Sequence, residues 1–182
     1  MTAKLRTTMA ATAALLAASG PAATQAEFAP VRVVESGSVT VAAPLDEAFE
    51  LFTPLGEARW VEGWRPRVLS PAELGLAASQ VFATSAKGRQ TVWMIVDYDR
   101  PACRIRYARL TPGWHVGTVD VACQAAGDGG TGVRVTYDLT AVSAAGADDL
   151  RAFADGYRQM MADWQAALDH YVTTGQPVHQ PH

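Results

Sequence analysis

The sequence lacks the patterns that identify several large functional classes. No metal-ligand spacing, phosphate-binding glycine loop or nucleophile elbow occurs in its 182 residues. No metal or cofactor is therefore expected, and no catalytic residue is assigned. The 15 basic residues are scattered and the formal net charge is -3, which argues against a nucleic-acid surface. Past the N-terminal leader, no run of about eighteen strongly apolar residues predicts a membrane-spanning helix.

Residues 1–26 have the composition of a secretory signal peptide. Lys4 and Arg6 form a positive start, residues 7–19 are rich in Ala and Leu, and residues 24–26 resemble a cleavage site. These features predict a periplasmic or secreted protein, with residues 27–32 as a linker. The alternative stays open: a wrongly assigned start codon would add an Ala-rich tail to a cytoplasmic protein.

A long amphipathic helix is predicted for residues 147–172, followed by a flexible tail at 173–182. Its apolar residues recur at three- and four-residue steps, which places them on one broad face. That face carries Leu150, Phe153, Ala154, Tyr157, Met160, Met161, Trp164, Ala167, Leu168 and Tyr171. Asp148 and Asp149 are interpreted as charge that complements the helix dipole, not as a catalytic pair.

Short strands are predicted for most of the chain before this helix. Residues 33–41 alternate as a first strand, and residues 44–52 favour a short helix that Pro54 and Gly56 end. The Gly- and Pro-rich segment that follows is predicted to be a loop with short helical turns, residues 53–79. Further strands are predicted for residues 80–85, 89–98, 103–110, 114–123 and 133–143, with a tight turn at Lys87-Gly88. The fold class is α+β, a curved antiparallel sheet wrapped around the C-terminal helix.

Strand registers are predicted by matching opposite charges on one face and apolar residues on the other. One register pairs Asp97 with Arg104, Val96 with Ile105, and Met94 with Tyr107. The next pairs Thr111 with His115, Arg106 with Asp120, Tyr107 with Val119, and Cys103 with Cys123. The inner, concave face then carries Val92, Met94, Val96, Ile105, Tyr107, Val119, Val121, Val133, Val135, Tyr137 and Leu139. Cys103 and Cys123 are disulfide candidates in an exported protein and two small buried thiols otherwise, with neither outcome preferred.

Four stretches resemble the START/Bet v 1-like helix-grip superfamily, also called SRPBCC. They are SVTVAAPLDEAF at 38–49, FTPLGEARWVEGW at 52–64, VDYD at 96–99 and VRVTY at 133–137. The resemblance covers residues 33–172 and implies a cavity between sheet and helix for an apolar or amphipathic small molecule. Members include lipid carriers, hormone receptors, aromatic polyketide cyclases and a domain related to Hsp90 ATPase activators.

The ligand-binding residues are expected to be large, flexible or polar side chains around that cavity. They are Trp60, Trp64, Met94, Tyr107, Arg109, His115, Tyr137, Tyr157, Met160, Met161 and Trp164. Arg109 suits a carboxylate or phosphate, because an unpaired buried guanidinium is costly. For His115 taken alone, a solvent-facing position at the strand end is the preferred interpretation.

Three functions are compatible with the sequence. The favoured one is a non-catalytic carrier or sensor of a hydrophobic small molecule. The second is a cyclase- or dehydratase-like enzyme that folds its substrate against Tyr107, Arg109 and His115. The third is a protein-interaction module, which would expose Trp60 and Trp64 as an apolar patch. Weak self-association of the chain is left open.

Overall fold

The computed structural model describes residues 28–70 and 77–178 of the chain. The leader predicted for residues 1–26 and the end of the predicted tail, residues 179–182, lie outside these ranges. Among the described residues, no helix combines the length and apolarity that a membrane crossing requires.

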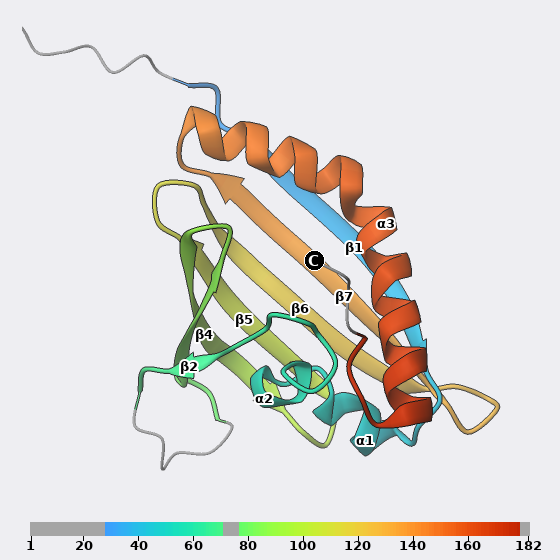
Figure 1. Cartoon of the computed structure of the whole chain (residues 1–182). Helices are drawn as coiled ribbons and strands as arrows, with labels where there is room; N and C mark the ends of the chain where they lie inside the picture. Colours follow the sequence, from blue (N-terminus) through green and yellow to red (C-terminus); the bar gives the residue numbers. More distant parts are fainter. Residues whose placement is uncertain (1–27, 71–76, 179–182) are drawn as a thin grey trace, which may run out of the picture.

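Seven antiparallel strands form one curved sheet (Figure 1). They are β1 (Arg32–Val41), β2 (Arg67–Val68), β3 (Val81–Ala86), β4 (Arg89–Asp99), β5 (Arg104–Thr111), β6 (His115–Ala125) and β7 (Thr131–Ala141). Their order in the sheet is β1-β7-β6-β5-β4-β3-β2, so consecutive strands from β2 to β7 are neighbours and β1 pairs with β7. The predicted antiparallel meander is confirmed, and the short strand β2 adds an edge within the segment predicted to be a loop.

Within residues 28–70 and 77–178, three helices accompany the sheet: α1 (Leu45–Glu50), α2 (Pro54–Glu57) and α3 (Ala144–Thr174). The long α3 runs across the sheet beside β1 and β7, with α1 near its C-terminal end (Figure 1). It begins three residues earlier than predicted, because the Ser143 side chain accepts a hydrogen bond from the Gly146 N–H. The first helix ends before Pro54 as predicted. The four-residue α2 is one of the short helical turns expected in residues 53–79, and Pro54 is its first residue, where a missing N–H costs nothing.

The predicted register between β5 and β6 is confirmed, and that between β4 and β5 is wrong. Arg106 lies opposite Asp120 as expected, whereas Asp97 also lies opposite Arg106 and not Arg104. A bulge between Ile95 and Asp97 shifts the pairing. Trp93 and Ile95 therefore face the core, and the predicted inner residues Met94 and Val96 are each 40% exposed.

The two connections around β4 and β5 use left-handed backbone. Lys87 (φ 50°) and Gly88 (φ 71°) form the predicted hairpin turn. Cys103 (φ 50°) precedes β5 instead of belonging to it. Its carbonyl still accepts a hydrogen bond from the Cys123 N–H at 3.0 Å, and both thiols are free. A disulfide between them stays a prediction.

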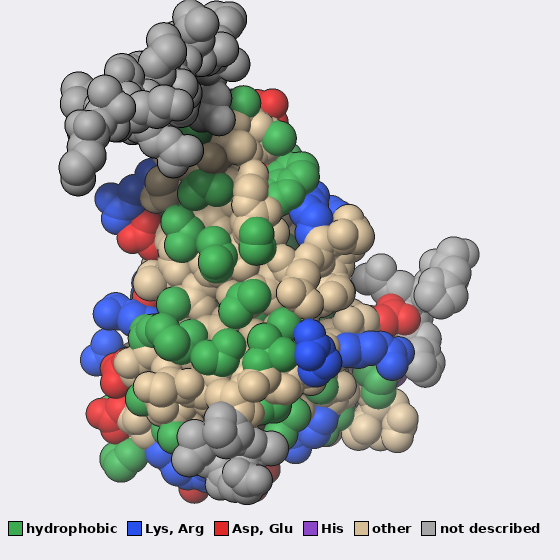
Figure 2. Space-filling view, turned by 90° about the vertical axis from the view of Figure 1, so that its left-hand side faces the viewer, with side chains coloured by type: hydrophobic (Ala, Val, Ile, Leu, Met, Phe, Trp, Pro, Cys, Tyr) green, Lys and Arg blue, Asp and Glu red, His purple; other side chains and the backbone are tan. Residues whose placement is uncertain are grey.

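The core lies between the concave face of the sheet and α3. Its largest fully buried side chains include Trp60, Phe49, Phe52, Phe82 and Ile95. Large apolar side chains also remain exposed on the strands, among them Val34, Leu110 and Val116. Figure 2 shows apolar side chains spread over one face of the molecule, with charged side chains mainly along its flanks.

Candidate functional site

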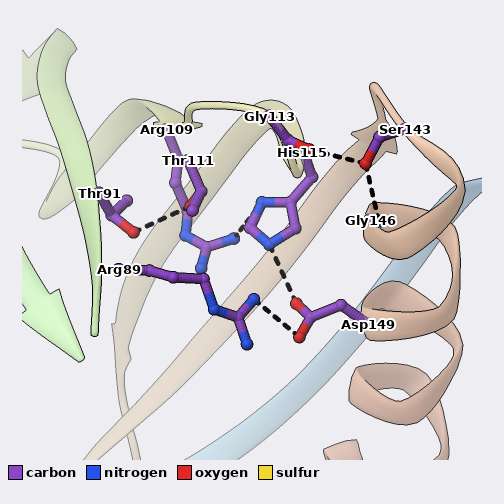
Figure 3. Close-up of polar contacts among 9 residues, drawn as sticks. All are labelled: Arg89, Thr91, Arg109, Thr111, Gly113, His115, Ser143, Gly146 and Asp149. Atoms are coloured by element: carbon purple, nitrogen blue, oxygen red, sulfur yellow. Dashed lines mark hydrogen bonds and ion pairs between the residues drawn. The ribbon is translucent and has the colours of Figure 1, made fainter. Parts of the chain in front are cut away.

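A chain of polar contacts joins the sheet to the second turn of α3 (Figure 3). Arg89 donates to Asp149 Oδ1 at 2.9 Å, Asp149 Oδ2 lies 3.3 Å from His115 Nε2, and His115 Nδ1 lies 3.1 Å from an Arg109 NH group. These four residues come from β4, α3, β6 and β5, and we refer to them as the polar bridge. Asp149 therefore fastens the helix to the sheet, which corrects its interpretation as helix-start charge alone.

The protonation of His115 follows from its two neighbours. A guanidinium can only donate, so His115 Nδ1 must accept from Arg109, and the ring proton sits on Nε2 and points to Asp149. Burial, followed by the positive charge of Arg109, lowers the pKa of His115. Partial burial alone would raise the pKa of Asp149, yet its hydrogen bonds to Arg89 and His115 hold that pKa below its usual value.

Arg109 remains the least satisfied member of the polar bridge. Its Nε is the one buried side-chain nitrogen or oxygen in the described part of the chain that has no hydrogen-bond partner. Its guanidinium carbon lies 5.3 Å from the centre of the Trp93 ring, on the aromatic face. Burial lowers the pKa of Arg109, although a guanidinium keeps its charge at neutral pH.

A partly enclosed space of about 50 Å³ lies between the sheet, the α2 region and α3, and we call it the aromatic cavity. Its wall consists of Glu57, Val61, Trp64, Phe82, Trp93, Tyr107, Val119, Val121, Val135, Tyr137 and Trp164. The rings meet mostly edge to face, for example Trp64 and Trp93 at 5.6 Å between centroids. A space of this size holds a few waters or one small chemical group.

Glu57 is the single acidic side chain in that wall. Its carboxylate has no hydrogen bond or ion pair with any of the described residues. Loss of hydration raises the pKa of Glu57 to about 8, so the protonated acid is favoured at neutral pH. Thr53 caps α2 through the Gly56 N–H, which leaves the Glu57 side chain without a capping role.

Two tyrosines stand in the same wall with different hydrogen bonding. The Tyr107 hydroxyl donates to the Phe52 carbonyl at 3.0 Å, whereas the Tyr137 hydroxyl has no partner among the described residues. Burial, followed by the nearby Glu57, raises the pKa of both tyrosines. Arg109 acts on Tyr137 in the opposite direction, so Tyr137 is electrostatically coupled to Glu57 and to Arg109.

The predicted ligand-binding residues fall into three groups. Trp64, Tyr107, Tyr137 and Trp164 line the aromatic cavity, and Arg109 and His115 belong to the polar bridge. His115 is 3% exposed, which contradicts its predicted solvent-facing position. The remaining predicted residues lie outside the cavity wall: Trp60, Met94, Tyr157, Met160 and Met161.

The predicted place of Met94 on the concave face is wrong, because this residue sits on the outward side of β4. Trp60 is a core residue whose indole N–H donates to the Leu51 carbonyl at 2.8 Å. At 1% exposure it cannot form the apolar surface patch that the interaction-module hypothesis required. Tyr157 is likewise structural, since its hydroxyl donates to the Val135 carbonyl.

The sequence predictions missed several residues of the site. They are Glu57, Val61, Phe82, Trp93 and Arg89, together with Asp149 as the hydrogen-bond partner of Arg89. A signal for Glu57 existed, since Glu57, Val61 and Trp64 are spaced like one face of a helix. Among the described residues, no group of three or more His, Cys, Asp or Glu side chains is placed to hold a metal ion.

Comparison with known proteins identifies one matching family. The model of the family described as "Polyketide cyclase / dehydrase and lipid transport" matches residues 32–171. That range runs from the first residue of β1 to the last turn of α3. No curated protein matches the chain.

Several solved structures share the fold at low sequence identity. The Zhui aromatase/cyclase from Streptomyces sp. R1128 has a TM-score of 0.58 and 22% identity, over 81% of this chain and 100% of that one. The protein Ara h 8.0201 has a TM-score of 0.56 and 15% identity, over 79% and 99%. Truncated norcoclaurine synthase from Thalictrum flavum has a TM-score of 0.56 and 11% identity, over 85% and 99%. These likenesses confirm the predicted helix-grip fold.

Proposed function

Because the chain belongs to the polyketide cyclase/dehydrase and lipid transport family, we propose that it binds a hydrophobic or amphipathic small molecule in the aromatic cavity. The observation that carries this proposal is the cavity wall. Six of its eleven residues are aromatic, and Glu57, Tyr107 and Tyr137 supply the polar groups. An apolar wall with a few directed polar groups is the usual form of a small-molecule site.

The size of the aromatic cavity limits what enters without rearrangement. Pockets for drug-sized ligands measure about 300–1,000 Å³, whereas this space measures about 50 Å³. It accepts a small guest or the head group of a longer one. A larger guest must displace a wall residue such as the partly buried Trp64, whose indole N–H donates to the Pro54 carbonyl at 2.9 Å.

The hydrogen bonds of Tyr107 and His115 argue against the cyclase-like role suggested for these two residues. That reaction would need an acid or base with a free proton site facing the substrate. Both ring nitrogens of His115 are engaged within the polar bridge, and the Tyr107 hydroxyl is committed to Phe52. In two of the three residues suggested for catalysis, the polar groups are therefore already hydrogen-bonded within the protein.

The proposal is tested with a small neutral aromatic probe and a variant that fills the cavity. We expect benzyl alcohol to bind the wild-type protein in a ligand-observed NMR titration. Val135→Phe should abolish this binding, because Val135 lines the cavity. Val34→Phe is the matched control, since Val34 is 55% exposed.

Circular dichroism checks that each variant folds, because overpacking a core costs about 1–3 kcal/mol. Val121→Met, also in the wall, serves as a milder filling change if Val135→Phe fails to fold. Native mass spectrometry of protein from its own organism should show a copurified small molecule. The proposal is refuted if filling the cavity leaves probe binding unchanged and no small molecule copurifies.

A further inference from the structure

Glu57 belongs neither to the apolar core nor to the polar bridge, so neither of them explains why a carboxyl group stands at this position. A carboxyl group beside apolar rings costs stability unless something pairs with it. The described residues offer Glu57 no hydrogen bond or ion pair, and no basic side chain contributes to its pKa. The missing partner is therefore expected to come from outside the chain.

The surroundings of Glu57 narrow the chemistry of that partner. Trp64, Trp93 and Trp164 stand in the same wall, with Phe82, Tyr107 and Tyr137 completing the set of rings. Indole, phenol and phenyl faces attract cations, and a ring of such faces is the common recognition device for ammonium groups. A carboxylate within that set adds the opposite charge.

Building on the proposed function, we propose that the aromatic cavity recognises the ammonium head group of an organic amine, with Glu57 as its counter-ion. The cavity volume of about 50 Å³ suits a head group of this kind. The apolar remainder of the ligand would extend past Trp64. Arg109, whose charge acts on Tyr137, carries the same charge as the ligand and so disfavours the reversed orientation.

The titratable groups around Glu57 make the binding depend on pH in a defined way. The pKa values of Tyr107 and Tyr137 are raised, so both stay neutral, and Arg109 stays charged. Glu57 must lose its proton to pair with an ammonium group. With its pKa at about 8, the ionised fraction rises about ninefold between pH 6 and pH 7.

The test compares benzylammonium with benzyl alcohol, which has nearly the same shape and no charge. We expect wild-type protein to bind benzylammonium more tightly, with an affinity that rises about ninefold from pH 6 to pH 7 and levels off above pH 8. Benzyl alcohol affinity should not change with pH. NMR titrations at pH 6, 7 and 8.5 measure both compounds.

Glu57→Gln should remove the preference for benzylammonium and its pH dependence, and keep benzyl alcohol binding. Glu47→Gln, a change at an exposed position of α1, is the matched control and should behave as wild type. Equal affinity for both compounds would overturn the amine proposal and leave the proposed function intact. An affinity that falls as pH rises would also overturn it, since a protonated Glu57 would then be donating to an acceptor. Failure of both compounds to bind would overturn both proposals.

Discussion

Replacing Glu57 by glutamine should make the folded protein more stable at neutral pH. The carboxyl group of an unfolded chain titrates near 4.5, whereas in the folded protein the pKa of Glu57 is about 8. At pH 7 the unfolded state has therefore released a proton that the folded state still holds. This difference favours unfolding, and glutamine removes it because an amide does not titrate.

The magnitude follows from the pH interval over which the two states differ. From pH 4.5 to pH 7, each pH unit contributes about 1.4 kcal/mol, which gives about 3 kcal/mol as an upper bound. Because Glu57 is partly exposed, residual hydration reduces this value, and we expect a gain of about 2 kcal/mol. At pH 4 the Glu57 carboxyl group is protonated in both the folded and the unfolded state, so the gain in stability should disappear.

Urea unfolding followed by far-UV circular dichroism at pH 4, 5, 6, 7 and 8 measures this effect. The difference in free energy of unfolding between Glu57→Gln and wild type should grow with pH and level off above pH 8. Glu47→Gln should show no such growth. A difference that is independent of pH, or a less stable Glu57→Gln at pH 7, would refute the reasoning that Glu57 is desolvated and unpaired.

Two further predictions concern the framework of the site. A Cβ on Gly117 would lie 1.9 Å from the Asp138 carbonyl oxygen, so Gly117→Ala should lower the free energy of unfolding by about 3 kcal/mol in urea titrations, the upper end of the usual cost of overpacking. Gly132→Ala is its control, because the nearest atom is 3.8 Å away, and a similar loss there would contradict the steric explanation. The lowered pKa of His115 means that the unfolded state takes up a proton first as pH falls below about 6.5. In thermal unfolding, the stability of the wild type relative to His115→Gln should therefore stay constant above that pH and decrease below it. His170→Gln is the control. No decrease relative to His115→Gln, or an equal decrease relative to His170→Gln, would exclude His115 as the cause.

The sequence predicted the parts of the sheet where charge and apolar patterns agree. Arg106 opposite Asp120 places charges on one face and leaves Tyr107 and Val119 on the other, so one register satisfies both requirements. In β4 both faces are apolar, with Trp93 and Ile95 on one and Met94 and Val96 on the other. Alternation alone could not choose between them, and the bulge at Val96 leaves no mark in the sequence.

The candidate site was harder to predict because its polar groups act across the fold. Asp149 and Arg89 are 60 positions apart, and only the crossing of α3 over the sheet brings them together. Taken along the helix, Asp149 is indistinguishable from the exposed Asp148 beside it. Glu57 was hidden for a different reason: Gly56, Gly63 and Pro66 interrupt the periodicity of its segment, so its helical spacing with Val61 and Trp64 did not stand out.

The polar bridge and the aromatic cavity differ in how completely the protein satisfies its own polar groups. Arg89 and His115 are each bonded to Asp149, so this cluster stabilises the contact between α3 and the sheet. In the part of the chain that the structure describes, Glu57 and the Arg109 Nε lack partners, although the two residues carry opposite charges and both act on Tyr137. A chain selected for stability alone would pair such groups or replace them with apolar residues. An unpaired Glu57 at the wall of the aromatic cavity is the arrangement expected where a guest completes its contacts.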